Sequence, residues 1–258
     1  MYQKKLQVCA FVPARGGSSG VKKKNILPLG DKPLIRHTLD FAKKSNFFHK
    51  IIVSTDCPTI ARISTDGILE EEEFIATPED YVLQISDDIL IHKRKTSHAQ
   101  NFSLIEDTMF DLSFPGNILS MFEYTVMLQP TSPFRRYEEL NRLKEIIKSE
   151  SHWTSIASFT DVHGMHPQKM WHINDSGMMS EYITDSNSST KPRQSLPKVF
   201  IKDGAYYCLR REVLQSRQLL GKKVLPMMRE GVCTLNIDSQ MDFEIAKLIE
   251  ENKERFGL

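Results

Sequence analysis

The chain has 258 residues, of which 40% are hydrophobic and 26% charged, and its formal net charge at pH 7 is +1. This length suits one α/β domain, and the near-neutral charge argues against a nucleic-acid or polybasic membrane-binding protein. The first residues lack the apolar region of a signal peptide, and no apolar run approaches a membrane span. The four cysteines form no CxxC pair, which argues against a zinc site and fits a reducing, cytoplasmic setting.

The first part of the chain alternates apolar runs with amphipathic stretches. Runs at 8–12 and 51–53 predict buried strands, and periodic positions at 33–45 and 58–63 predict helices. Pro33 suits the first position of the earlier helix. This alternation predicts a parallel sheet with crossover helices, in which ligands bind beyond the carboxyl ends of the strands. A loop over 14–25 and Asp56 follow two such ends.

The pattern weakens between residues 65 and 110. Four acidic residues at 70–73 indicate a solvated face, and short apolar runs at 74–76 and 89–91 are candidate strands. A helix is expected over 101–110, with Leu104 and Ile105 facing inward.

The second half begins with a predicted central strand at 124–128, which ends in the turn Gln129-Pro130-Thr131-Ser132-Pro133. An amphipathic helix follows at 137–148 and a strand at 153–159, whereas residues 160–203 have little periodicity. Further strands are expected at 204–209 and 232–237, with a short helix from Glu212 between them. The last helix, over 240–255, begins with a capping box formed by Ser239 and Asp242.

The loop after the first strand has the composition of a phosphate site. It reads Ala14-Arg15-Gly16-Gly17-Ser18, with Lys24-Asn25 at its far end. Glycines allow backbone amides to approach an anion closely, and Arg15 and the lysines add positive charge. The spacing matches neither the P-loop nor the dinucleotide-binding loop. A strand that runs into such a loop is suited to binding a nucleoside triphosphate.

The loop at 14–25 and the turn that begins at Gln129 closely resemble motifs of the CMP-sialic acid synthetases, or N-acylneuraminate cytidylyltransferases, including the legionaminic and pseudaminic acid enzymes. Similar segments at 51–56, 192–197, 204–207 and 236–243 extend the resemblance over nearly the whole chain. It implies a Rossmann-like, GT-A-like nucleotidyltransferase fold with a mostly parallel sheet and helices on both faces. It also implies one domain over 1–258, with an arm at 160–203 that crosses to the partner subunit of a homodimer. The stretch between the second and third strands is longer than expected for this family, which suggests an insertion at 65–87.

The resemblance implies that CTP and a nonulosonic acid, a nine-carbon keto-acid sugar, give a CMP-sugar and pyrophosphate. The anomeric 2-hydroxyl would attack the α-phosphate with Mg²⁺ present. Arg15, Lys24 and Asp238 would be catalytic, with Asp238 and Asn236 holding the metal. Gln129 and Arg193 would bind the sugar. The nucleotide-binding residues would be Ala14, Arg15, Gly16, Gly17, Ser18, Lys24 and Asn25.

Four places depart from the family's pattern. Ser19 replaces a lysine, Asn236 replaces the first aspartate of an Asp-Ile-Asp motif, and Ser97-His98-Ala99 replaces a Ser/Thr-Asp motif. Ile201 and Lys202 stand where many members have an arginine before an Asn-Gly-Ala sequence. These changes leave open an altered sugar specificity or weakened catalysis.

Three alternatives follow. The chain could be a nucleotide-binding or structural homodimer that has lost catalysis. It could be a CMP-Kdo synthetase, although that family has Gln-Gly-Asp-Glu-Pro where this chain has Gln129-Pro130-Thr131-Ser132-Pro133. Asp238 could also act as a helix cap and not as a metal ligand.

Overall fold

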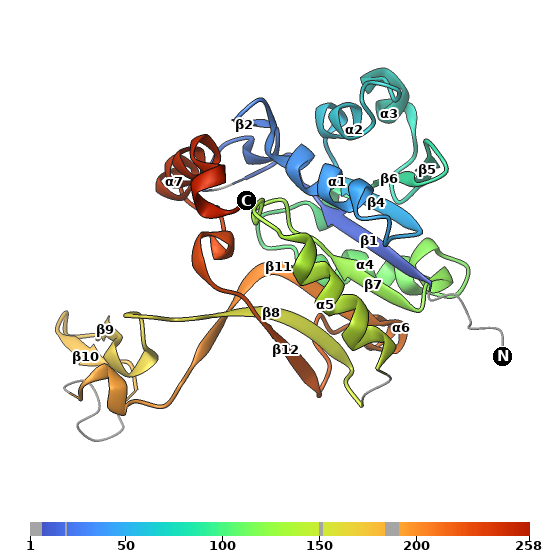
Figure 1. The fold of residues 1–258 in the computed structure, drawn as a ribbon. Helices are drawn as coiled ribbons and strands as arrows, with labels where there is room; N and C mark the ends of the chain where they lie inside the picture. The colour runs from blue at the N-terminus through green and yellow to red at the C-terminus, as the bar shows by residue number, and fades with distance from the viewer. Residues whose placement is uncertain (1–6, 19, 150–151, 184–190) are drawn as a thin grey trace.

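The computed structural model describes residues 7–18, 20–149, 152–183 and 191–258. The described residues form an eight-stranded sheet in the order β12-β8-β11-β7-β1-β4-β6-β5 (Figure 1). The strands of this sheet are β1 Val8–Pro13, β4 Lys50–Thr55, β5 Val82–Gln84, β6 Ile89–Lys93, β7 Tyr124–Met127, β8 Ser155–Asp161, β11 Phe200–Arg210 and β12 Val224–Met228. The helices are α1 Leu34–Lys44, α2 Pro58–Ser64, α3 Glu71–Ala76, α4 Ile105–Ser113, α5 Tyr137–Lys148, α6 Arg211–Gln215 and α7 Gln240–Glu251.

The centre of the sheet is parallel. Strands β7, β1, β4 and β6 pair in parallel, whereas β11 runs antiparallel between β7 and β8, and β5 is an antiparallel edge strand. This arrangement confirms the predicted α/β fold with a mostly parallel sheet. It also places the carboxyl ends of β1, β4, β6 and β7 along one edge, where ligands bind in such sheets.

Helices cover both faces of the sheet, which explains the unbroken apolar run in β1. Val8, Ala10 and Val12 face a core shared with α1, α2 and α5. Cys9 and Phe11 face a second core shared with α4 and α6. The alternation of side chains along a strand therefore supplies both cores.

Helix α7 covers a third, smaller core beside a short hairpin of β2 Pro28–Leu29 and β3 Lys32–Pro33. Ser239 is the N-cap of α7, and its hydroxyl accepts a hydrogen bond from the Asp242 amide at 3.2 Å. Asp242 in turn accepts from the Ser239 amide at 2.7 Å, which confirms the predicted capping box. Pro33 was expected to be the first residue of α1 but is the residue that precedes it.

Three predictions in the first half need correction. Residues 74–76 end helix α3 and are not a strand, because only Phe74 is buried while Ile75 stays exposed. The helix predicted at 101–110 begins at Ile105, since the preceding residues form turns. Leu104 lies outside this helix and is exposed, so its predicted inward position is wrong, whereas Ile105 packs against the core as expected.

The strand predicted at 232–237 is also wrong. The strand in this part of the chain is β12, an edge strand of the sheet, which pairs in parallel with β8. Residues Gly231–Thr234 form a 3-10 helix, and Cys233 and Ile237 are buried under α7. These apolar residues are therefore buried against helix α7 and do not form a strand of the sheet.

Strands β8 and β11 extend beyond the sheet as a paired ribbon, in which Phe200 lies opposite Asp161. The ribbon carries a separate hairpin of β9 Trp171–Ile173 and β10 Met179–Glu181, away from the helices that cover the sheet (Figure 1). Within the described ranges, no helix is long and apolar enough to cross a bilayer.

Candidate active site

The glycine-rich loop leaves the end of β1 and is held by β4. The amide of Ala14 donates to the carbonyl of Ser54 at 2.9 Å, and the amide of Gly16 donates to Asp56 Oδ1 at 2.8 Å. The side-chain amide of Asn25 closes the loop by donating to the carbonyl of Arg15 at 3.0 Å. The loop is therefore fixed at both ends, as a site that binds an anion with backbone amides requires.

The loop also meets the segment that precedes α7, more than 200 residues later in the chain. The buried Lys24 side chain donates to the carbonyl of Ile237 and lies 3.3 Å from Asp238 Oδ1. A Cβ atom on Gly20 would lie 1.9 Å from the carbonyl oxygen of Asp238, so glycine is required at this close approach. The glycine-rich loop and the segment Ile237–Asp238 therefore lie against each other.

A cavity of about 500 Å³ opens at the carboxyl ends of β1, β6 and β7. Its lining combines four cationic or histidine side chains with amides and hydroxyls, and Asp238 at one side. The lining residues are Pro13, Arg15, Gly17, Ser18, Gly20, Lys24, Asn25, Arg94, His98, Asn101, Ser103, Ile105, Gln129, Pro130, Thr131 and Asp238. Such a polar, cationic cavity is suited to a phosphorylated ligand.

Most of the predicted site residues lie around this cavity. Arg15, Gly17, Ser18, Lys24, Asn25, Gln129 and Asp238 all line it. Ala14 is buried behind the loop, and Gly16 faces a neighbouring cavity beside Asp56. Asn236 is not among the lining residues, but its side-chain amide donates a hydrogen bond to Asp238. The backbone of Arg193 begins a 3-10 turn within the 160–203 segment, but its side chain and the whole of Ser19 lie outside the described part of the structure.

Arg94 is a cavity residue that the sequence did not indicate. Its guanidinium donates to the hydroxyl of Ser54 at 3.1 Å and to the Ser54 carbonyl at 2.7 Å. Burial lowers the pKa of Arg94 to about 10. Among the described residues, no carboxylate lies within ion-pairing distance of it. A buried cation without a counterion at a ligand cavity is a strong candidate to bind an anion or a carbonyl oxygen.

His98, which belongs to one of the four departures from the family's pattern, also lines the cavity. It lies in the 3-10 helix Thr96–His98, and its Nδ1 atom is 3.9 Å from Asp111. Lys95 bridges Asp111 at 2.7 Å and Asp80 at 2.9 Å. Arg94 and His98 could have been suspected because they follow the apolar run at 89–91, which is a parallel strand whose carboxyl end faces the site.

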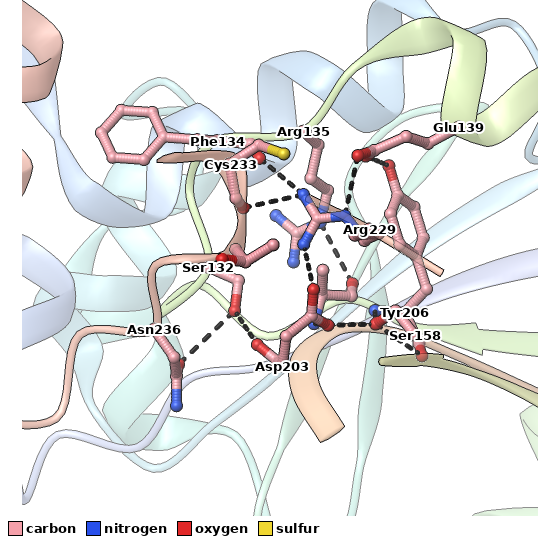
Figure 2. A network of polar contacts seen from close by, with 12 residues as sticks. Ser132, Phe134, Arg135, Glu139, Ser158, Asp203, Tyr206, Arg229, Cys233 and Asn236 are labelled. Carbon is pink, nitrogen blue, oxygen red and sulfur yellow. Dashed lines mark hydrogen bonds and ion pairs between the residues drawn. The ribbon is translucent and has the colours of Figure 1, made fainter. Parts of the chain in front are cut away.

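Asp238 and Asn236, the two predicted metal ligands, are hydrogen-bonded to each other. Asn236 Nδ2 donates to Asp238 Oδ2 at 2.7 Å, and Asn236 Oδ1 accepts from the Ser132 hydroxyl at 3.4 Å (Figure 2). The Asp238 carboxylate is exposed at the cavity. Within the described ranges, no group of three His, Cys, Asp or Glu side chains could hold a metal alone. One exposed carboxylate fits Mg²⁺ that is bound chiefly by phosphate and water oxygens.

Comparison with known proteins agrees with this geometry. Residues 9–254 match the sequence model of a family described as Cytidylyltransferase. The chain belongs to the cytidylyltransferase family. This membership confirms the resemblance seen in the sequence.

Several named relatives of this cytidylyltransferase use acidic sugars. It is 26% identical over 249 residues to the N-acylneuraminate cytidylyltransferase of Escherichia coli, covering 96% of this chain and 53% of that protein. It is 25% identical over 252 residues to the CMP-N,N'-diacetyllegionaminic acid synthase of Legionella pneumophila, covering 96% and 99%. The chain thus spans about half of the first relative and almost all of the second.

The fold also occurs in a solved structure with a nucleotide. A CMP:2-keto-3-deoxy-manno-octonic acid synthetase complexed with CTP aligns with a TM-score of 0.62 over 96% of this chain and 99% of that one. The sequence identity is 14%, so this likeness supports the fold and says nothing about which sugar this cytidylyltransferase uses.

Proposed function

We propose that this cytidylyltransferase joins CMP from CTP to a nonulosonic acid and releases pyrophosphate. The observation that carries the proposal is the meeting of the glycine-rich cationic loop with the Asp238 segment around one cavity at the carboxyl ends of the strands. The names of the relatives, which concern N-acylneuraminate and legionaminic acid, support the sugar class. The free cysteines fit a cytoplasmic reaction.

The loop end of the cavity is suited to the triphosphate. Backbone amides at Gly17 and Ser18 and the side chains of Arg15 and Lys24 would meet the negative charge of the phosphates. Arg94 adds a buried cation at the same cavity. Transfer of a nucleotidyl group depends chiefly on alignment and charge neutralisation, which fixed cations supply without reorganisation.

The part of the cavity formed by the turn after β7 is suited to the sugar acid. The Gln129 amide and the Thr131 hydroxyl offer hydrogen-bonding groups where β7 ends. We propose that Arg193, on the arm of a partner subunit, binds the sugar carboxylate, since a guanidinium pairs with a carboxylate through two hydrogen bonds. In this proposal the active form is a homodimer.

The reaction forms a bond between the anomeric 2-oxygen and the α-phosphorus and breaks the bond from that phosphorus to the oxygen of the leaving pyrophosphate. The hydroxyl proton passes to water in the open cavity as the new bond forms. Asp238 would hold Mg²⁺, while Asn236 orients the carboxylate through its amide. When bound, Mg²⁺ would neutralise phosphate charge and polarise the phosphoryl group. Arg15 and Lys24 would stabilise the charge that develops in the transition state.

An assay of pyrophosphate release tests the proposal. The protein is incubated with CTP and, separately, N-acetylneuraminic, legionaminic, pseudaminic and Kdo acids, with and without Mg²⁺. We expect turnover with at least one nonulosonic acid, with Mg²⁺ and with CTP in preference to ATP or GTP. Turnover only with Kdo would support the alternative synthetase. Stabilisation by CTP without turnover on any sugar would support a catalytically weakened binding protein.

A further inference from the structure

Four charged side chains form a buried network beside the turn that carries Gln129 (Figure 2). They are Arg229, which pairs with Glu139 and Asp203, and Arg135, which adjoins them at the ring of Tyr206. The side chains of Asp203 and Arg229 are both 0% exposed. Two cations and two carboxylates make the network electrically neutral. None of the four lines the cavity described above, so the proposed chemistry has not used them.

Arg229 joins four segments of the chain. Its Nε atom donates to Glu139 at 2.8 Å, and its Nη1 atom donates to Asp203 Oδ2 at 2.6 Å. Its Nη2 atom donates to the carbonyls of Phe134 at 2.7 Å and Cys233 at 2.9 Å. Arg229 therefore ties the turn after β7 to the segment that leads to Asp238, through donors whose directions are fixed by the planar guanidinium.

Asp203 continues the same connection toward the site. Its Oδ1 atom accepts from the Ser158 hydroxyl and from the amide of Ala205. Its backbone carbonyl accepts from the Ser132 hydroxyl at 3.0 Å, and that hydroxyl also lies 3.4 Å from Asn236 Oδ1. The backbone of Asp203 is thus linked through the single hydroxyl of Ser132 to Asn236, the residue that orients Asp238.

Gly204 packs closely against the turn that carries Gln129 and Ser132. Its φ is +79°, and a Cβ atom there would lie 2.5 Å from Gln129 Oε1 and 3.2 Å from the Ser132 hydroxyl. Arg135 holds the same turn from the other side by donating to the carbonyl of Gln129 at 2.7 Å. A shift of the Asp203 backbone would therefore be transmitted to Gln129.

The charges in the network depend on one another. Burial lowers the pKa of Arg229, but the carboxylates of Glu139 and Asp203 outweigh this effect and raise it above the ordinary value. The centroid of the Tyr206 ring lies 5.5 Å from the guanidinium of Arg229 and 5.7 Å from that of Arg135. Removing one member leaves a buried charge without its partner, which costs more than removing both.

We infer that Arg229 and Asp203 act together as positioning residues, which hold Gln129, Asn236 and Asp238 in register for nucleotidyl transfer without touching either substrate. This inference rests on the proposed function. A backbone hydrogen bond from the Ile237 amide to the Thr131 carbonyl, at 2.8 Å, joins the segment that leads to Asp238 to the turn after β7. Loss of the Arg229 contacts should loosen that link first.

Three variants test the inference: Arg229→Met, Asp203→Asn and the double variant. Arg229→Met should lower kcat about a hundredfold, as a displacement of reacting groups by about 1 Å does, with little change in the KM for CTP. The double variant should recover part of the thermal stability lost in the single variants, because Arg229 and Asp203 no longer leave each other unpaired, although Glu139 still lacks the Arg229 guanidinium. Its kcat should stay as low as that of Arg229→Met, since the carbonyls of Phe134 and Cys233 still lack their donor.

Hydrogen exchange supplies a readout that does not need activity. In Arg229→Met, exchange at the Ile237 amide should accelerate, while the amides of β1 and β4 keep their protection. Arg36→Met is the control, because the Arg36 guanidinium pairs with Asp40 on α1 and with Asp66 after α2, and these ion pairs involve none of the four network residues. It should lower stability without changing kcat or exchange at Ile237.

Two results would overturn the inference. One is a double variant whose kcat recovers together with its stability, and the other is unchanged protection at Ile237 in Arg229→Met. An inactive wild-type protein would count against the proposed function instead. The exchange measurement would then still report whether Arg229 holds the segment in place.

Discussion

The side-chain amide nitrogen of Asn236 lies 2.7 Å from one carboxylate oxygen of Asp238, and Lys24 Nζ lies 3.3 Å from the other. Asp238 is therefore held between two donors while its carboxylate stays exposed to the cavity. The N-cap of α7 is the next residue, Ser239. The arrangement separates the two roles considered for Asp238, since capping does not require its side chain.

Asp238→Asn should lower turnover by about a hundredfold or more, because the exposed carboxylate at the cavity would be lost. Thermal stability should change little, because Ser239 and Asp242 still form the capping box. Activity measured against Mg²⁺ concentration checks the assignment. Ser239→Ala is the control and should lose about 1 kcal/mol of stability with an unchanged Mg²⁺ response. A wild-type Mg²⁺ response in Asp238→Asn would refute the metal role.

Asn236→Asp should tighten Mg²⁺ binding in the absence of CTP. The substitution replaces a hydrogen-bond donor to Asp238 with a second carboxylate, and a divalent cation relieves the repulsion between two neighbouring carboxylates. We expect at least about tenfold tighter binding, or about 1.4 kcal/mol, by calorimetry. Asn236→Ala removes the amide without adding charge and should not tighten binding. Equal affinity in the wild type and Asn236→Asp would contradict the prediction.

The arm should form the interface of a homodimer. Met165, Trp171 and Met178 are 73%, 49% and 67% exposed, and apolar side chains gathered on one projecting segment mark an interaction surface. Solution scattering at micromolar concentration should give the mass of a dimer. Trp171→Ser should weaken the dimer and reduce turnover on the sugar while CTP still binds.

Met241→Ser is the matched control for the arm. Met241 is 69% exposed on α7, outside the arm, so this variant should remain dimeric. A monomeric wild-type protein under the same conditions would overturn the dimer proposal.

Stability should fall as the pH is lowered from about 6.5 to about 4, in part through His92. Burial lowers the pKa of His92 from 6.5 to about 4, although the Asp80 carboxylate opposes the shift. Over this interval the unfolded chain binds a proton that the folded protein does not, so the folded state loses about 3 kcal/mol.

Urea unfolding across this pH range tests the assignment. His92→Gln should have a shallower dependence of unfolding free energy on pH, with His163→Gln, on the exposed surface, as the control. The carboxylates with lowered pKa values, such as Asp40 and Asp80, lose their contribution only below 3.8. The same pH slope in the wild type and His92→Gln would show that another group is responsible.

The sequence by itself determined the parts of this protein that depend on neighbouring residues. The run at 8–12 is buried on both sides, and the amphipathic stretch at 137–148 is helix α5 with the predicted bounds. The Ala14–Ser18 loop and the turn from Gln129 are recognisable because a strand end, glycines and prolines occur within a few residues of one another. These local signals were sufficient to indicate the fold class and the family.

Only the tertiary structure decided which distant residues meet. The apolar residues at 232–237 resemble a strand, but burial under α7 satisfies the same pattern. Arg94 becomes a site residue because β6 pairs with β4, and Arg229 meets Asp203 because β12 pairs with β8 and β8 with β11. The position of a charged residue in the sequence does not show which residue is its ion-pair partner. The partner is set by strand order and register, which depend on the packing of the whole chain.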